Sequence, residues 1–110
     1  MRVTIAWWDL SRSAQTIASL RAILRDEAVD RFAQVPGLRL KLWIADEAND
    51  RWGAVMLWES AQASAAPLPA CAAELIGYPP THRHEFDVEA TTEGLYDTVR
   101  LAGLGRALTE

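Results

Sequence analysis

The sequence is poor in the features that define several protein classes. Its 110 residues include one cysteine, Cys71, which excludes an internal disulfide and favours a reducing compartment such as the cytoplasm. No apolar run approaches the length of a membrane span, and the first residues lack the profile of a signal peptide. The net charge of −4 and the lack of a basic cluster argue against binding to nucleic-acid phosphates. We therefore expect one soluble, cytoplasmic domain over residues 1–110 that binds neither nucleic acid nor membrane.

Motifs for familiar chemistry are also scarce. There is no glycine-rich phosphate loop, and neither histidine has an evident nucleophile beside it, so acyl transfer has no support. His82 and His84 share a strand face, but no third metal ligand is identifiable by spacing, so we expect no metal site. The acidic residues Asp46, Glu47 and Asp50 are expected to form a solvated turn.

Tryptophan, by contrast, is abundant. Five tryptophans in 110 residues are explained either by a core rich in bulky side chains or by an aromatic-lined pocket. The five are Trp7, Trp8, Trp43, Trp52 and Trp58.

Hydrophobic periodicity and chain breakers predict the order of the elements. Alternation predicts strands over residues 3–8, 38–44, 52–58 and 82–89. An apolar stripe predicts a long helix that begins after Ser11 or Ser13 and ends before Pro36. An alanine-rich stretch predicts a short helix to about Ala66 and a second helical piece from about Pro69 to residue 76. A last helix is expected over residues 93–108. The apolar stripe consists of Ile17, Leu20, Leu24, Ala28 and Phe32.

The hairpin over residues 38–58 has two unlike faces. If its turn is centred between Ala48 and Asn49, the opposite pairs are Lys41 with Met56, Trp43 with Ala54, and Arg39 with Trp58. We expect the aliphatic face to pack on the long helix and a partner subunit to cover the aromatic face, which is too apolar to remain solvated. The aliphatic face carries Leu38, Leu40, Leu42, Ile44, Val55 and Leu57, and the aromatic face carries Arg39, Lys41, Trp43, Trp52, Met56 and Trp58.

The order β-α-β-β-α-β in a chain of this length predicts an α+β fold, a ferredoxin-like sandwich with an antiparallel sheet. Such a sheet has helices on one face only. Two copies packed sheet to sheet would cover the other face and form a dimeric α/β barrel. Residues 91–110 would then form a helical extension at the C-terminal end.

Several segments together resemble a known family. Residues 36–43 (P-G-L-R-L-K-L-W), 52–60 (W-G-A-V-M-L-W-E-S), 61–63 (A-Q-A) and 85–89 (E-F-D-V-E) are similar to the small monooxygenases of the dimeric α/β-barrel superfamily, the antibiotic-biosynthesis monooxygenase group. The resemblance covers about residues 1–90. It implies a homodimer with an apolar cavity in each subunit. In some members it also implies oxygenation of aromatic or quinol-forming substrates without metal or flavin.

The sequence departs from that family at two prolines, Pro67 and Pro69, and in its last twenty residues. Both departures could reshape the mouth of a pocket. A related branch degrades haem with an asparagine, a tryptophan and a histidine. The one asparagine here, Asn49, lies in the hairpin turn, which disfavours that branch.

The candidate site follows from the aromatic face. Cofactor-free oxygenation needs an apolar cavity for an aromatic substrate and a group that deprotonates it or stabilises its anion. Lys41 and Arg39 are the catalytic candidates, because a cation can stabilise a phenolate. Alternatively, these cations pair with acidic residues across a dimer, and the chain is a non-catalytic small-molecule-binding or structural dimer. The candidate ligand-binding residues are Trp7, Trp8, Trp43, Met56 and Trp58.

Overall fold

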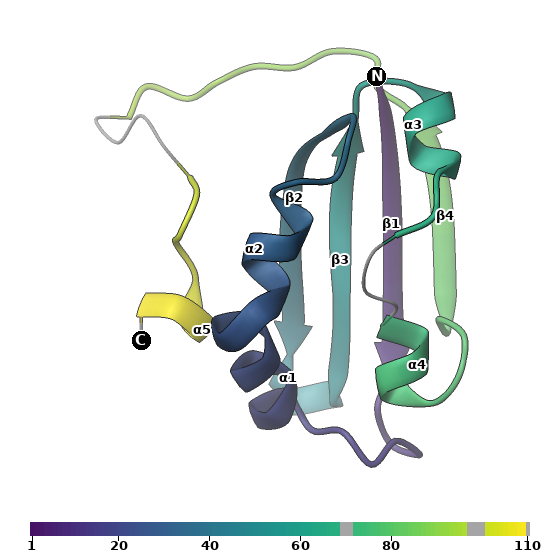
Figure 1. Cartoon of the computed structure of the whole chain (residues 1–110), viewed down its shortest axis with the longest axis vertical. Helices are drawn as coiled ribbons and strands as arrows, with labels where there is room; N and C mark the ends of the chain where they lie inside the picture. Colours follow the sequence, from purple (N-terminus) through teal and green to yellow (C-terminus); the bar gives the residue numbers. More distant parts are fainter. Residues whose placement is uncertain (69–71, 97–100, 110) are drawn as a thin grey trace.

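The protein is an α+β domain built on one antiparallel sheet. The computed structural model describes residues 1–68, 72–96 and 101–109. The 4-stranded sheet has the order β2-β3-β1-β4, so β3 and β1 are central and β2 and β4 are edges (Figure 1). This order is compatible with the predicted ferredoxin-like fold. The strands are β1 (Arg2–Asp9), β2 (Leu38–Asp46), β3 (Arg51–Trp58) and β4 (His82–Asp87).

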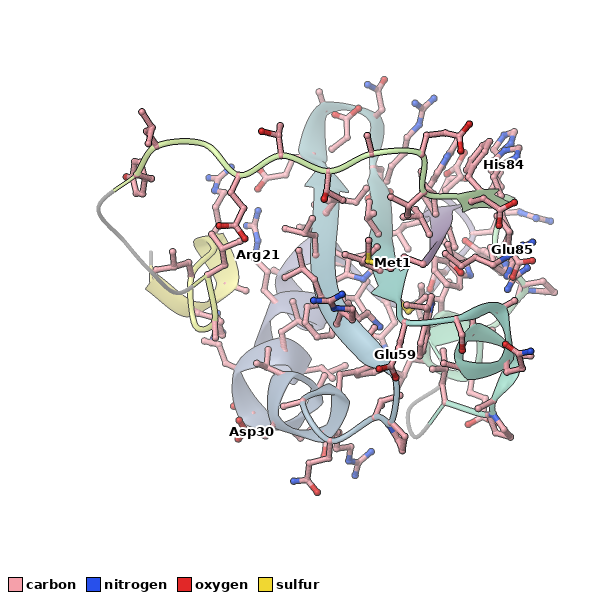
Figure 2. All side chains as sticks on the ribbon, turned by 90° about the horizontal axis from the view of Figure 1, so that it is seen from above. Met1, Arg21, Asp30, Glu59, His84 and Glu85 are labelled. Atoms are coloured by element: carbon pink, nitrogen blue, oxygen red, sulfur yellow. The ribbon has the colours of Figure 1, made fainter. Side chains whose placement is uncertain are left out.

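A layer of helices covers one face of the sheet, as the views from the front and from above both show (Figures 1 and 2). Over β2 and β3 lies one continuous helical stretch made of three consecutive segments. The shorter α3 and α4 lie over β1 and β4. The three consecutive segments are α1 (Ile17–Ile23), the π-helical η1 (Leu24–Ala28) and α2 (Val29–Phe32); the shorter helices are α3 (Ala61–Ala65) and α4 (Ala72–Ile76).

The predicted long helix is confirmed, but its start is not where the sequence placed it. Thr16 is the N-cap in place of Ser11 or Ser13: its side chain accepts a hydrogen bond from the backbone N–H of Ser19, and the Ser19 hydroxyl bonds the Thr16 backbone in return. This reciprocal pair satisfies backbone donors that have no partner within the helix. All five residues of the predicted stripe are buried.

The hairpin register is confirmed for Lys41 and Trp43 but not for Arg39, and the prediction of which face meets the helices is wrong. Lys41 pairs with Met56 and Trp43 with Ala54, across the short turn η2 (Glu47–Asn49). The helices cover the aromatic face, where Trp58 is 1% exposed. Leu42, which was expected to pack on the long helix, is 47% exposed on the opposite face. Alternation sorts side chains into two faces, but here both faces are apolar, and the larger aromatic side chains fill the space between helix and sheet.

No described element packs on the aliphatic face of the sheet. Leu42, Ile44 and Phe86 are each more than 40% exposed there, at 47%, 43% and 54%. A row of rings also follows β4 on this face, with Trp7 stacked on His82 at 4.3 Å between centroids. An antiparallel sheet with one free face normally presents polar side chains to water. The exposed face of this sheet is instead apolar, and no part of the described chain covers it.

The last part of the chain differs from the predicted helix over residues 93–108. Residues 88–96 cross the top of the molecule without regular structure, and among the described residues that follow β4 only α5 (Arg106–Thr109) is helical (Figure 1). Residues 97–100 of the predicted helix lie outside the described residues. Leu95 and Tyr96 are 105% and 82% exposed, so no apolar helix face is buried there. Gly103 and Gly105 have positive φ angles of 83° and 126°, which interrupt a helix.

Two further predictions about helices have mixed outcomes. The short helix to about Ala66 is confirmed as α3, capped by Ser60, whose hydroxyl accepts from the N–H of Ala63 at 3.1 Å. The second piece is confirmed from Ala72 to Ile76 as α4, and its predicted start, residues 69–71, lies outside the described residues. Nowhere in the described part does a helix combine the length and the apolar composition that a membrane span requires.

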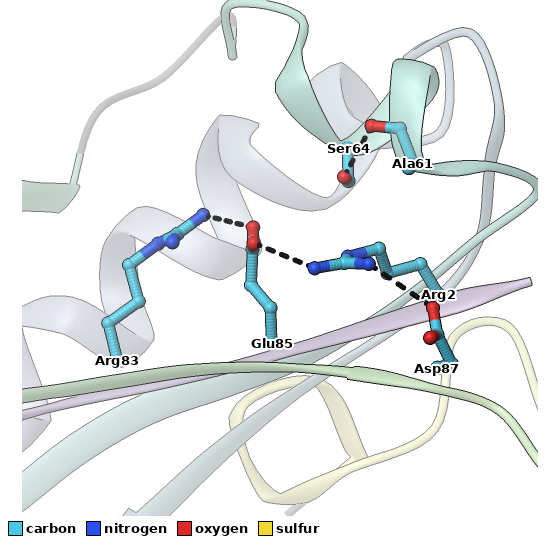
Figure 3. Close-up of polar contacts among 6 residues, drawn as sticks. All are labelled: Arg2, Ala61, Ser64, Arg83, Glu85 and Asp87. Atoms are coloured by element: carbon cyan, nitrogen blue, oxygen red, sulfur yellow. Dashed lines mark hydrogen bonds and ion pairs between the residues drawn. The ribbon is translucent and has the colours of Figure 1, made fainter.

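An ion-pair chain ties β4 to β1 on the helix-covered side, near α3 (Figure 3). Arg2 bonds Asp87 at 3.2 Å and Glu85 at 3.3 Å, and Arg83 bonds Glu85 at 2.8 Å. The hydrogen bond and charge of Arg83, with those of Arg2, hold the pKa of Glu85 below its usual value. The charged residues of this edge strand are therefore used within the subunit and stay apart from the aliphatic face.

Candidate functional site

A cleft lies between the long helix, the edge strand β2 and the segment before the chain end. Its volume is about 630 Å³, within the range of roughly 300–1,000 Å³ for small-molecule sites. Most of its lining is apolar. The charged residues that line it are Arg39, Lys41 and Arg106, and no carboxylate does so among the described residues. We call it the Lys41 cleft; its walls are Leu24, Val29, Phe32 and Ala33, residues 38–43, and residues 101–108.

Lys41 projects from β2 into an aromatic corner of this cleft. Its Nζ lies 3.3 Å from the centroid of the Phe32 ring and 4.7 Å from that of Trp43. The two rings meet edge to face at 5.6 Å. The β alternation places Lys41 and Trp43 on the same face of the strand, and Phe32 reaches them from the last turn of α2. The amine is therefore held between two ring faces.

Burial changes the protonation of this amine. Removal from water disfavours the charged form of a lysine, and it lowers the pKa of Lys41 to about 7. No hydrogen bond or ion pair with a described residue offsets this effect. Near neutral pH a substantial fraction of Lys41 is therefore an uncharged amine, which can accept a proton or act as a nucleophile.

Arg39 lies at the mouth of the Lys41 cleft, but not where the register prediction placed it. The ladder shifts between Leu38 and Leu40, so Leu38 is opposite Trp58 and Arg39 is the extra residue of a bulge. Its guanidinium is exposed and lies 3.4 Å from the sulfur of Met1. The structure thus brings Arg39, Lys41 and Trp43 to one cleft, with Arg39 at its solvent side.

The other predicted ligand-binding residues lie elsewhere. Trp8, Met56 and Trp58 are 7%, 8% and 1% exposed in the layer between helices and sheet. Trp8 is fixed there, because its indole N–H donates to the Tyr78 carbonyl at 2.9 Å. Trp7 lies on the aliphatic face, with the Arg51 guanidinium over its ring at 4.8 Å. Three of the five predicted ligand-binding residues are thus packing residues, one faces outward, and only Trp43 lines the Lys41 cleft.

The sequence does not predict two features of the cleft. Phe32 is predicted only as part of the core stripe. Its position as the last member of that stripe, just before the break at Pro36, is the one signal that it could lie in the cleft. The wall formed by residues 101–108 had no signal, because its placement depends on contacts far apart in the sequence.

Polar contacts hold that wall against the helix. Arg25 donates to the Ala107 carbonyl at 3.3 Å. Glu47 in the hairpin turn pairs with Arg21 of α1 and lies 3.8 Å from Arg106. The Arg21 hydrogen bond and charge keep the pKa of Glu47 below its usual value. Glu47 therefore links the turn, the long helix and the wall of the cleft.

The histidines do not form a metal centre with described neighbours. His82 and His84 lie 6.2 Å apart between ring centroids and are exposed on the aliphatic face. Across the described ranges 1–68, 72–96 and 101–109, no group of three or more potential metal ligands lies together.

No protein-family model matches this chain, and no curated protein matches its sequence.

Proposed function

We propose that the protein binds a small aromatic phenol or hydroquinone in the Lys41 cleft and oxygenates it without a cofactor. The observation that carries this proposal is the composition of the cleft: apolar and aromatic walls, one amine between two rings, further cations and no carboxylate among its described lining residues. Such a lining suits an apolar ligand that bears, or develops, a negative charge.

The chemistry that this site would perform begins with a proton transfer. The neutral Lys41 amine accepts the proton of a phenolic hydroxyl, and the resulting ammonium stabilises the phenolate beside it. The electron-rich anion then reduces dioxygen directly. One oxygen atom enters the ring, the other leaves as water, and the substrate supplies the electrons. The resemblance to the antibiotic-biosynthesis monooxygenase group supports this reaction class, and the single cysteine supports a cytoplasmic location.

The quaternary part of the proposal is a homodimer joined through the aliphatic sheet faces, as in a dimeric α/β barrel. It is supported by the uncovered apolar face that includes Leu42, Ile44 and Phe86. A twofold axis would place the same patch on both subunits, so that each covers the other. This interface is the reverse of the one expected from the sequence, which used the aromatic face.

A second candidate is a non-catalytic binding protein that uses the same cleft. The burial of Trp8, Met56 and Trp58 favours it, because most of the expected aromatic lining proves to be core. The two candidates differ in whether dioxygen is consumed.

The test combines oxygen uptake with ligand binding. The wild type is given 1-naphthol and 1,4-naphthohydroquinone, with heat-denatured protein to measure autoxidation, and quenching of tryptophan fluorescence reports binding. The matched control for Lys41→Met is Arg31→Met, which removes one cation from an exposed helix position outside the cleft. We expect uptake above background that Lys41→Met abolishes and Arg31→Met retains. Saturable quenching without uptake would establish the binding protein, and the absence of both would overturn the proposal.

A further inference from the structure

The cationic side chains of this protein are almost all arginine. Of its eleven lysine and arginine residues, ten are arginine and one is Lys41. Arginine stays protonated at any physiological pH, whereas a buried lysine can lose its proton and become a nucleophile. The one side-chain amine, that of Lys41, lies in the cleft between two aromatic rings.

The surroundings of Lys41 match what a reactive amine requires. Phe32 is 5% exposed and Trp43 is half-buried, so the amine is shielded on two sides by ring faces. The lining contains no described carboxylate that would hold the amine as an ammonium ion. Burial lowers its pKa to about 7. The remaining side is the cleft itself, with space for a ligand of drug-like size.

We propose that Lys41 captures a small aromatic aldehyde or ketone in this cleft as a covalent imine. The lone pair of Nζ adds to the carbonyl carbon, and one N–H proton passes to the carbonyl oxygen. The carbinolamine then loses that oxygen as water with the second N–H proton, and a C=N bond forms. One amine and one carbonyl give one imine and one water, with no change of oxidation state.

This activity goes beyond the proposed oxygenation, since it uses the same cleft but neither dioxygen nor a phenol. The half-buried Trp43 gives the carbonyl compound its aromatic preference. A ring packed against Trp43 brings a carbonyl substituent toward Nζ, which lies 4.7 Å from the centroid of that ring. Carbonyl compounds without an apolar body gain no such contact.

Reductive trapping of the full chain tests the proposal. The protein is incubated at pH 7 with 2-naphthaldehyde and sodium cyanoborohydride, and the adduct is located by peptide mass spectrometry. The chain has one side-chain amine, so the α-amine of Met1 is the internal reference. We expect the adduct on Lys41. Its rate of formation should be at least roughly tenfold higher than in urea-unfolded protein, where the pKa of Lys41 returns to about 10.4.

Controls separate the cleft from general amine reactivity. Glyoxylate, which is not aromatic, should label Lys41 more slowly than 2-naphthaldehyde does. Trp43→Leu should reduce the labelling rate of Lys41 while that of Met1 is unchanged. Adduct on Met1 alone, or equal Lys41 rates in folded and unfolded protein, would overturn the proposal. The oxygen-uptake assay tests the oxygenase independently. Labelling of Lys41 without oxygen uptake supports the imine and overturns the oxygenase. Oxygen uptake without labelling supports the oxygenase and overturns the imine.

Discussion

At the scale of single residues, the molecule contains polar groups in places where contact with water is reduced. Lys41 is one of them, and its aromatic neighbours replace only part of the hydration that a charged amine loses. Thr4 is another, at 2% exposure, and its hydroxyl has no hydrogen-bond partner in the described part of the chain. Each costs stability in the native state, and each cost can be measured with a single substitution.

The cost at Lys41 depends on pH. Below about pH 7 the amine is protonated in both states, and the folded chain bears the full cost of its burial. Between about pH 7 and 10.5 only the unfolded chain holds this proton, so the free energy of unfolding rises with pH. Lys41→Met removes this dependence. We expect the stability of the wild type relative to Lys41→Met to increase by roughly 3 kcal/mol from pH 7 to pH 10.

Urea unfolding of both proteins at fixed concentration, at intervals of one pH unit, measures this difference, because other titrating groups are shared and cancel. Parallel stability curves for the two proteins would show that Lys41 titrates as an exposed lysine.

The Thr4 hydroxyl gives a second prediction. Thr4→Val replaces an unpaired buried hydroxyl by a methyl group of similar shape, so the free energy of unfolding should rise by roughly 1 kcal/mol. Thr4→Ser keeps the hydroxyl and removes the methyl group, so it should lower stability. Both are measured by urea titration. If Thr4→Val is less stable than the wild type, the hydroxyl has a bonding partner.

At the scale of secondary-structure elements, close approach of backbone fixes how α3 sits over the sheet. Gly37, in the loop between the long helix and β2, has a φ of 78°, and a Cβ there would lie 2.4 Å from the Cβ of Ala63 in α3. Glu59 also donates its backbone N–H to the Gly37 carbonyl at 2.8 Å. One glycine thus joins the loop before β2, the end of β3 and the helix α3 that follows it.

Gly37→Ala should therefore lower the free energy of unfolding by roughly 1–3 kcal/mol, through left-handed backbone strain and the collision with α3. Gly77→Ala is the control, because its φ of 106° is also positive but its Cβ would meet nothing within 4 Å. The excess cost of Gly37→Ala measures the collision. Ala63→Gly in the same chain should restore part of the loss, and no restoration would mean that strain alone accounts for it.

The hairpin shows how far the sequence predicts these elements. Strand alternation and the turn centre were sufficient to pair Lys41 with Met56, since both are local properties. The bulge at Arg39 left no trace in the alternation of the strand. Which face meets the helices depends on packing between distant segments, and a sheet that is apolar on both faces has no local signal for it. Lys41 and Trp43 were predictable as neighbours, but Phe32 joins them only through the fold.

At the scale of the whole molecule, the proposed dimer depends on the aliphatic sheet face. Its exposed leucine, isoleucine and phenylalanine side chains lie on both edges of the sheet, in β2 and β4. Water contact with such a broad apolar surface is unfavourable, at roughly 25 cal/mol per Å². The proposed dimer removes this surface from water in both copies.

Leu42→Asp should convert the proposed dimer into a folded monomer, because a charge would be buried without a partner at the interface. The matched control is Leu75→Asp, which makes the same change at 42% exposure, compared with 47% for Leu42, but in the helix layer. Light scattering after gel filtration, with circular dichroism to check folding, measures the outcome. A wild type that is monomeric at micromolar concentration would overturn the dimer.

The two sides of the Lys41 cleft depend on the rest of the fold in different ways. One side is built from the long helix and β2, which the sheet and core require. The other is residues 101–108, a short segment held by Ala107, which is buried in the core, and by polar contacts with Arg25 and Glu47. Substitutions of its exposed residues Leu101 and Leu104 can therefore change which molecules the cleft admits while Ala107 keeps its place in the core. Selectivity and folding depend on different residues of this segment, so that each can evolve without the other.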